Sequence, residues 1–191
     1  MSANSTSRQT GFTIVELLIV IVVIGVLAAI TVVAYSGIQE RANNTAVIAA
    51  AKQVQQIITA YKTTNGSLPV AYNACLTTDN SCTTYTGVEQ TNDNNALMTE
   101  LRKIGTPPSS VPGTNPTYHG LYYNYYSPRT YNGNVAPALL MYWLKGEQQD
   151  CQLANVGRQL PGTATEINPY ETSTTGYTSS GNGITNCWVS L

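Results

Sequence analysis

A single carboxylate stands at the start of a long apolar run near the N-terminus. Glu16 follows Phe12 by four residues, and no residue from 17 to 39 is charged. A charged side chain costs about 2.5–3.5 kcal/mol at the centre of a membrane, so a carboxylate at this position is expected to serve a purpose. Residues four apart share one face of a helix. Glu16 can therefore act at the helix end that carries Phe12.

The other groups that could do chemistry form no catalytic set. His119 is the single histidine, and the acidic residues Asp79, Glu89, Glu147 and Asp150 are scattered along the chain. They offer no paired spacing for acid–base catalysis, and neither a phosphate-binding loop nor a Gly-x-Ser-x-Gly motif is present. The sequence predicts no enzymatic activity, no catalytic residue and no cofactor.

Two Asx-rich stretches, residues 79–80 and 92–95, could supply oxygen ligands to calcium. Ordinary turns explain them more simply, because Asn and Asp favour turns through their own side-chain hydrogen bonds. We therefore predict no metal site.

The apolar run predicts a membrane-spanning helix. At ~1.5 Å per residue, residues 17–39 extend roughly 35 Å, which is enough to cross a bilayer. A secretory signal peptide would have a shorter apolar core and a cleavage site beyond it, whereas a simple signal anchor would explain only the span. Arg8 is the only charged side chain in residues 1–11. It favours a cytoplasmic N-terminus and an exported C-terminal part.

These N-terminal residues resemble the signature of type IV pilins and type II secretion pseudopilins. After Gly11 and Phe12, the run TIVELLIV matches the family pattern closely. The resemblance implies that residues 1–11 are a leader, that a prepilin peptidase cuts between Gly11 and Phe12, and that Phe12 is then N-methylated. It also assigns Glu16 to neutralising the N-terminal amine of a neighbouring subunit, and Gly25 to helix flexibility.

Two roles for Glu16 stay open. After cleavage it can pair with the Phe12 amine of its own chain at the positive helix end, worth ~0.3–1 kcal/mol. The resemblance implies instead a bond to the neighbour's amine that sets axial register. Many type IV pilins carry a helix-kinking proline where this chain has Val33, which weakens the expectation that this helix melts locally on assembly, although Gly25 could still loosen it.

Beyond the span, the helix is predicted to continue as far as Asn65 and Gly66. No proline precedes Pro69, and Asn-Gly is a helix stop signal. An apolar stripe is expected at Ile38, Ala42, Ala46, Ala50, Val54, Ile57 and Tyr61, with Arg41, Asn44, Lys52, Gln55 and Lys62 on the other faces.

The rest of the chain predicts a short helix from Asp93 to about Lys103 and strands at residues 121–126, 138–144 and 187–191. Residues 67–92 and 161–183 are expected to be loops. The predicted fold class is α+β: a long N-terminal helix, transmembrane in its first half, packed on a small antiparallel sheet as in pilins. The predicted domains are a leader (1–11), a transmembrane or filament-core helix half (12–35), an amphipathic helix half (36–65) and an exported domain (66–191).

Four cysteines lie in the predicted exported domain: Cys75, Cys82, Cys151 and Cys187. An even count outside the cytoplasm favours disulfides, and three pairings are possible. We favour Cys75 with Cys82 and Cys151 with Cys187, a choice that the pilin resemblance supports because many pilins tie a C-terminal loop with one disulfide. A zinc site is disfavoured because no pair has C-x-x-C spacing.

Tyrosine is the unusual aromatic residue, with 13 copies against one Phe and two Trp. Tyr122, Tyr123, Tyr125 and Tyr126 should alternate faces in a strand, so that some point outward. Outward tyrosines fit either a solvated surface or an adhesive one. Charged residues make up only 10% of the chain and the net charge is −1, which gives no basic surface for nucleic acid.

The sequence therefore predicts a structural pilin subunit of a type IV pilus-like surface filament. Before assembly it would be a single-pass membrane protein with its C-terminal domain exported, and afterwards part of a fimbrium outside the cell. The expected partners are copies of itself or other pilins, the prepilin peptidase, an assembly platform protein and an assembly ATPase. The alternatives are a pseudopilin of a secretion or DNA-uptake machine, and a membrane-tethered adhesin or binding module.

Overall fold

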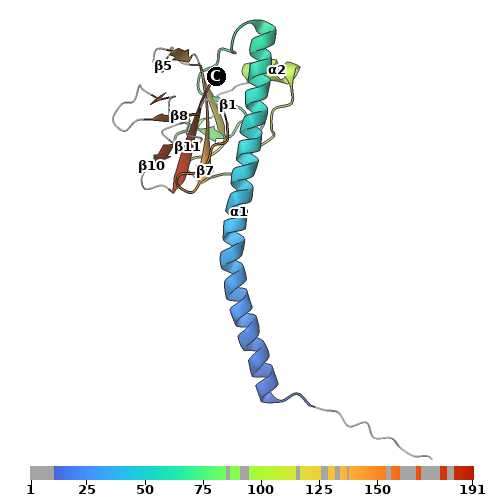
Figure 1. Cartoon of the computed structure of the whole chain (residues 1–191). Helices are drawn as coiled ribbons and strands as arrows, with labels where there is room; N and C mark the ends of the chain where they lie inside the picture. The colour runs from blue at the N-terminus through green and yellow to red at the C-terminus, as the bar shows by residue number, and fades with distance from the viewer. Residues whose placement is uncertain are drawn as a thin grey trace, which may run out of the picture. The chain divides into compact units, whose positions relative to one another are not determined.

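The computed structural model describes residues 11–84, 87–90, 95–114, 117–125, 129–131, 134–136, 138–153, 156–159, 167–168, 177–179 and 183–191. The chain divides into two compact units, Met1–Gln39 and Glu40–Leu191. The fold is α+β, as predicted: a long N-terminal helix and an antiparallel sheet (Figure 1).

The long helix, α1, runs from Ile14 to Asn65. No proline interrupts it, and its C-terminal end is closed by Gly66, whose φ of 75° is a backbone conformation that suits glycine. The N–H of Gly66 donates to the carbonyl of Lys62 at 2.9 Å. The helix therefore ends where the Asn-Gly signal predicts.

The second unit contains the main sheet, whose strands run in the order β1-β4-β7-β11-β8-β9. A seventh strand, β10, also pairs with β11. The pairings within this sheet are antiparallel. The strands are β1 (Ala74–Cys75), β4 (Leu121–Asn124), β7 (Leu139–Lys145), β8 (Val156–Gln159), β9 (Ile167–Asn168), β10 (Tyr177–Ser179) and β11 (Ile184–Ser190). The longest pairing joins β7 to β11, from Lys145 opposite Ile184 to Leu139 opposite Ser190.

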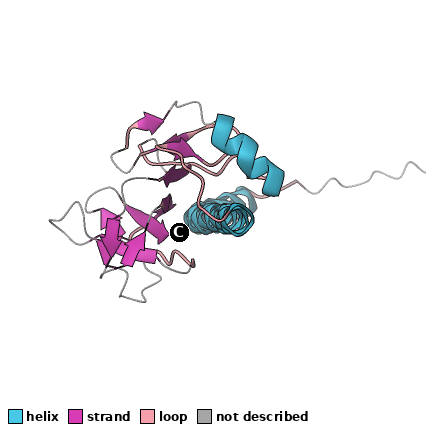
Figure 2. Ribbon diagram, turned by 90° about the horizontal axis from the view of Figure 1, so that it is seen from above, coloured by secondary structure: helices cyan, strands magenta, loops and turns pink. Residues whose placement is uncertain are grey.

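Smaller elements complete the second unit. Helix α2 spans Asn95–Ile104. Two short strand pairs lie outside the main sheet: β2 (Cys82–Thr83) with β3 (Glu89–Gln90), and β5 (Arg129–Tyr131) with β6 (Asn134–Ala136). Figure 2, which looks along α1, shows strands and α2 arranged around the helix.

The three predicted strands exist with shifted ends. β4 ends at Asn124, β7 continues to Lys145, and β11 begins at Ile184 rather than at Cys187. The predicted loop 67–92 contains β1, β2 and β3, and the predicted loop 161–183 contains β9 and β10, so both loop predictions were wrong in part. Strands of two or three residues carry too little periodicity to be recognised in sequence. Asp93, the predicted start of the short helix, lies outside the described residues.

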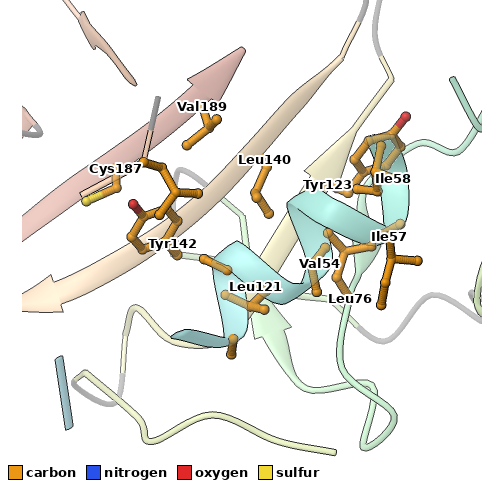
Figure 3. Close-up of a cluster of buried hydrophobic side chains, with 14 of the residues drawn as sticks. Val54, Ile57, Ile58, Leu76, Leu121, Tyr123, Leu140, Tyr142, Cys187 and Val189 are labelled. Carbon is orange, nitrogen blue, oxygen red and sulfur yellow. The ribbon is translucent and has the colours of Figure 1, made fainter. Parts of the chain in front are cut away.

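The main core lies between the second half of α1 and one face of the sheet. Figure 3 shows Val54, Ile57 and Ile58 of α1 together with the strand residues Leu140 and Tyr123. The predicted stripe was correct for Ala50, Val54 and Ile57 and wrong at its start, since Ile38, Ala42 and Ala46 are exposed. The buried helix positions that it omitted are Asn44, Val47, Ile48, Ala51 and Ile58.

The opposite face of β4, β7 and β11 is also buried, so the prediction that some of these tyrosines point outward is wrong for Tyr122. Tyr123 lies in the main core and Tyr122 in a second cluster, and both are fully buried. In that second cluster Tyr122 joins Trp143 and Trp188, with the ring of Tyr118 centred 6.1 Å from that of Trp143. The strand alternates as expected, but loops cover the face that was expected to meet solvent. Tyr126 lies outside the described residues.

The buried tyrosines use their hydroxyl groups to hold loops to the sheet. Tyr123 donates to the carbonyl of Pro69 at 2.6 Å, and Tyr142 donates to the carbonyl of Cys151. Burial raises the pKa of both phenols, and for Tyr142 the nearby Asp150 carboxylate adds to the rise. These side chains therefore act as neutral hydrogen-bond donors inside the fold.

One polar side chain of α1 attaches the helix to the end of β7. Asn44, only 7% exposed, donates from Nδ2 to the carbonyl of Lys145 at 2.8 Å and accepts from the Lys145 N–H at 2.9 Å. The Lys145 Nζ also lies 3.7 Å from a carboxylate oxygen of Glu40. The prediction that Asn44 covers a solvent face was wrong, because its amide matches the donor and acceptor of an unpaired peptide group.

Candidate assembly site at the N-terminal helix

The first turn of α1 holds the predicted carboxylate in a capping box. Glu16 Oε2 accepts a hydrogen bond from the Thr13 N–H at 2.8 Å and another from the Thr13 hydroxyl at 2.8 Å. In return, the Glu16 N–H donates to Thr13 Oγ1 at 3.2 Å. Thr13 is thus the N-cap residue and Glu16 is the third residue of the helix, the reciprocal arrangement that satisfies two free donors of a helix start.

Sequence reasoning placed Glu16 but missed Thr13. The signal was present, because Thr-x-x-Glu directly before an apolar run is the sequence form of a capping box. The geometry directs the carboxylate back toward the start of the helix, next to the junction of Gly11 and Phe12. Phe12 itself is 86% exposed. The peptide bond between Gly11 and Phe12 therefore lies before the cap residue Thr13, outside the helix.

The helix that follows is apolar and uncovered within the first unit. Its large aliphatic side chains between Ile14 and Ile30 are 49–86% exposed. By length and composition α1 could cross a membrane. Apolar surface of this extent is expected to be covered by lipid or by protein.

Gly25 lies within this apolar segment. A Cβ added there would meet no atom within 4 Å, so the position is free of close packing in the single chain. Further along, the Thr31 hydroxyl donates to the carbonyl of Ala28 at 2.9 Å. This hydroxyl is therefore satisfied by the helix itself, as a polar group in lipid must be.

The four cysteines lie in the second unit and pair in the arrangement that we favoured. The Cα atoms of Cys75 and Cys82 are 5.4 Å apart, and those of Cys151 and Cys187 are 5.8 Å apart; both pairs form disulfides. The first bond closes a short loop beside β1 and β2. The second ties Cys151, just after the turn that follows β7, to the middle of β11.

His119 has a partner that the sequence did not indicate. His119 lies just before β4, and its Nε2 is 3.3 Å from a carboxylate oxygen of Glu89 in β3. Asp79 Oδ1 accepts the Ser81 N–H at 3.2 Å, which is the Asx turn expected of that stretch. Within the described parts of the chain, no three His, Cys, Asp or Glu side chains gather as a metal site.

Comparison with known proteins identifies the N-terminal segment. Residues 6–32 match the family model described as the prokaryotic N-terminal methylation motif. This motif is the class III signal of type IV pilins and pseudopilins. It covers Gly11, Phe12, the capping box and Gly25. Searches of curated proteins and of solved structures gave no match.

Proposed function

We propose that this chain is the precursor of a pilin, a structural subunit of a type IV pilus-like filament. The observation that carries the proposal is the methylation motif at residues 6–32, with a capped Glu16 at the start of an exposed apolar helix. In this proposal a prepilin peptidase cuts after Gly11 and the new Phe12 amine is methylated. The enzyme activity belongs to the peptidase, and this chain has a structural role.

Assembly would use two properties of α1. Its apolar side chains would leave lipid and pack against the same helix in other subunits. Glu16 would neutralise the protonated Phe12 amine of a neighbour, an interaction that is strong where water is excluded. A head-to-tail contact of this kind does not close on itself and generates a filament. An assembly platform protein and an assembly ATPase would be the further partners.

The first test is mass spectrometry of filaments sheared from intact cells. We expect an abundant peptide that begins at N-methylated Phe12. The same peptide found only in membranes would favour the pseudopilin alternative, which the motif supports equally. An unprocessed N-terminus in all fractions would contradict the proposal and leave a simple signal anchor.

The second test separates the charge of Glu16 from its capping role. Glu16→Gln keeps a side-chain acceptor for the Thr13 N–H but removes the charge, because Gln also serves in capping boxes. Thr13→Val removes the capping hydroxyl and keeps the charge. We expect Glu16→Gln to abolish sheared filaments while processing at Gly11 continues, and Thr13→Val to lower their amount only in part.

The control is Glu147→Gln, which removes an exposed carboxylate of the second unit. It should assemble normally. Normal assembly of Glu16→Gln would refute the neutralisation role. If wild-type cells display the second unit on their surface but form no filament, and Glu16→Gln leaves that display unchanged, the results would favour the membrane-tethered adhesin.

A further inference from the structure

We propose a specific membrane register for α1 before assembly: Glu16 at the cytoplasmic interface and Tyr35 at the opposite interface, with its ring among the lipid headgroups. This inference rests on the proposed function, because it assumes a membrane-inserted precursor. It adds the depth of each part of the helix and the residue that contacts the outer lipid surface.

The first helical turn fixes the inner end. The N–H groups of Ile14 and Val15 have no acceptor within the helix, since they precede its first complete turn. The Leu17 N–H is the first to bond back along the chain, to the carbonyl of Thr13 at 3.3 Å. Free N–H groups are not tolerated in hydrocarbon. The turn that includes Glu16 therefore lies where water or headgroups reach it.

Helix length then places the outer end. At ~1.5 Å per residue, Tyr35 lies about 28 Å from Glu16 along the helix, close to the ~30 Å thickness of a bilayer's hydrocarbon core. Gly25 falls near the midpoint of this span. A helix tilt of about 20° would shorten the depth by less than one helical turn.

The chemistry of Tyr35 suits this position. Its side chain is 68% exposed, so the ring is available to lipid. Tyrosine prefers the membrane–water interface because its ring is apolar and its hydroxyl needs a polar partner. In the sequence it ends the run of residues 17–35, in which Thr31 is the one other hydroxyl-bearing side chain, and Ser36 and Gly37 follow it. The charged residues Glu40 and Arg41 begin about one further turn along the chain.

The inference is tested with single tryptophans in vesicles. The full chain is reconstituted in phosphatidylcholine whose acyl chains carry bromine either near the glycerol backbone or near the bilayer centre. Bromine quenches tryptophan fluorescence at short range. The variants are Tyr35→Trp, Leu27→Trp for the interior and Tyr72→Trp for the exposed surface of the second unit. The native Trp143 and Trp188 are at most 5% exposed, and wild-type protein gives their background.

Tyr35→Trp should lose most fluorescence with shallow bromine, Leu27→Trp should lose most with deep bromine, and Tyr72→Trp should match wild type with both. If Leu27→Trp is quenched while Tyr35→Trp is quenched by neither lipid, or more strongly by deep bromine, the register is wrong and membrane insertion stands. If Leu27→Trp is also unquenched, the helix is not inserted, and both the register and the proposed membrane precursor fail.

Discussion

Removal of the Asn44 side chain should destabilise the second unit, although the sequence pattern predicted that this side chain lies on a polar face of the helix. Asn44→Ala loses two hydrogen bonds, of 2.8 and 2.9 Å, to the backbone of Lys145. Each bond contributes about 1 kcal/mol net, and a buried peptide group left without a partner costs about 1–3 kcal/mol. We expect the free energy of unfolding to fall by about 2–4 kcal/mol, which corresponds to several degrees in Tm.

The assay is urea unfolding of the full chain in detergent, followed by the fluorescence of Trp143 and Trp188, both buried in the second unit. The matched control is Thr45→Ala, one residue along, where an exposed hydroxyl donates only to the Arg41 carbonyl of its own helix at 2.8 Å. That variant should change stability by less than about 0.5 kcal/mol.

A third variant tests whether the amide donor matters. Asn44→Asp keeps an acceptor for the Lys145 N–H but places a second oxygen against the Lys145 carbonyl. Burial and this repulsion should raise the carboxyl pKa in the folded state above its unfolded value, so stability should be lost as pH rises past the unfolded pKa of about 3.9. If Asn44→Ala unfolds within 0.5 kcal/mol of the control, on the order of ordinary surface substitutions, the reasoning is refuted.

Three further predictions use the same unfolding assay. Gly120 has φ +83° and a Cβ there would lie 2.3 Å from the Ser81 carbonyl oxygen, so Gly120→Ala should cost about 1–3 kcal/mol more than Gly66→Ala. Gly66 also has a positive φ (+75°) but lies in open space, so Gly66→Ala measures the cost of the backbone strain alone. Equal losses of stability in the two variants would show that the close contact at Gly120 costs nothing. Replacing both Cys151 and Cys187 by Ser removes a disulfide that joins residues 36 apart in sequence, and should lower the free energy of unfolding by roughly 4 kcal/mol. An unchanged free energy of unfolding would show that this disulfide does not constrain the unfolded chain. The raised pKa of Tyr142 means that its stabilisation is complete below the unfolded pKa of about 10 and declines above it. Tyr142→Phe should therefore flatten the loss of stability above pH 10, and an unchanged slope would exclude this phenol as the cause.

Much of α1 was predictable because its information is local. Helix propensity, the absence of proline and the Asn-Gly stop define α1 from neighbouring residues alone, and its observed bounds, Ile14–Asn65, agree with them. The capping box at Thr13 and Glu16 has an equally local signature. The methylation motif is likewise a property of consecutive residues, and comparison with known proteins found it at residues 6–32.

The second unit was less predictable because burial depends on what packs against each face. The period of the helix placed Val54 and Ile57 in the core, but Asn44 is buried only because the end of β7 offers it an unpaired peptide group. A strand pattern shows that Tyr122 and Tyr123 face opposite ways, without showing that loops cover the second face.

The sequence by itself determined the long helix, its charged first turn, the methylation motif and the presence of three main strands, since each follows from contacts between near neighbours in the chain. The tertiary structure decided the role of Asn44, the burial of the tyrosines on both faces of the sheet, and the approach of Glu89 to His119. Those outcomes need groups far apart in sequence to meet, and the free energy of their contacts depends on the solvent that the rest of the fold excludes.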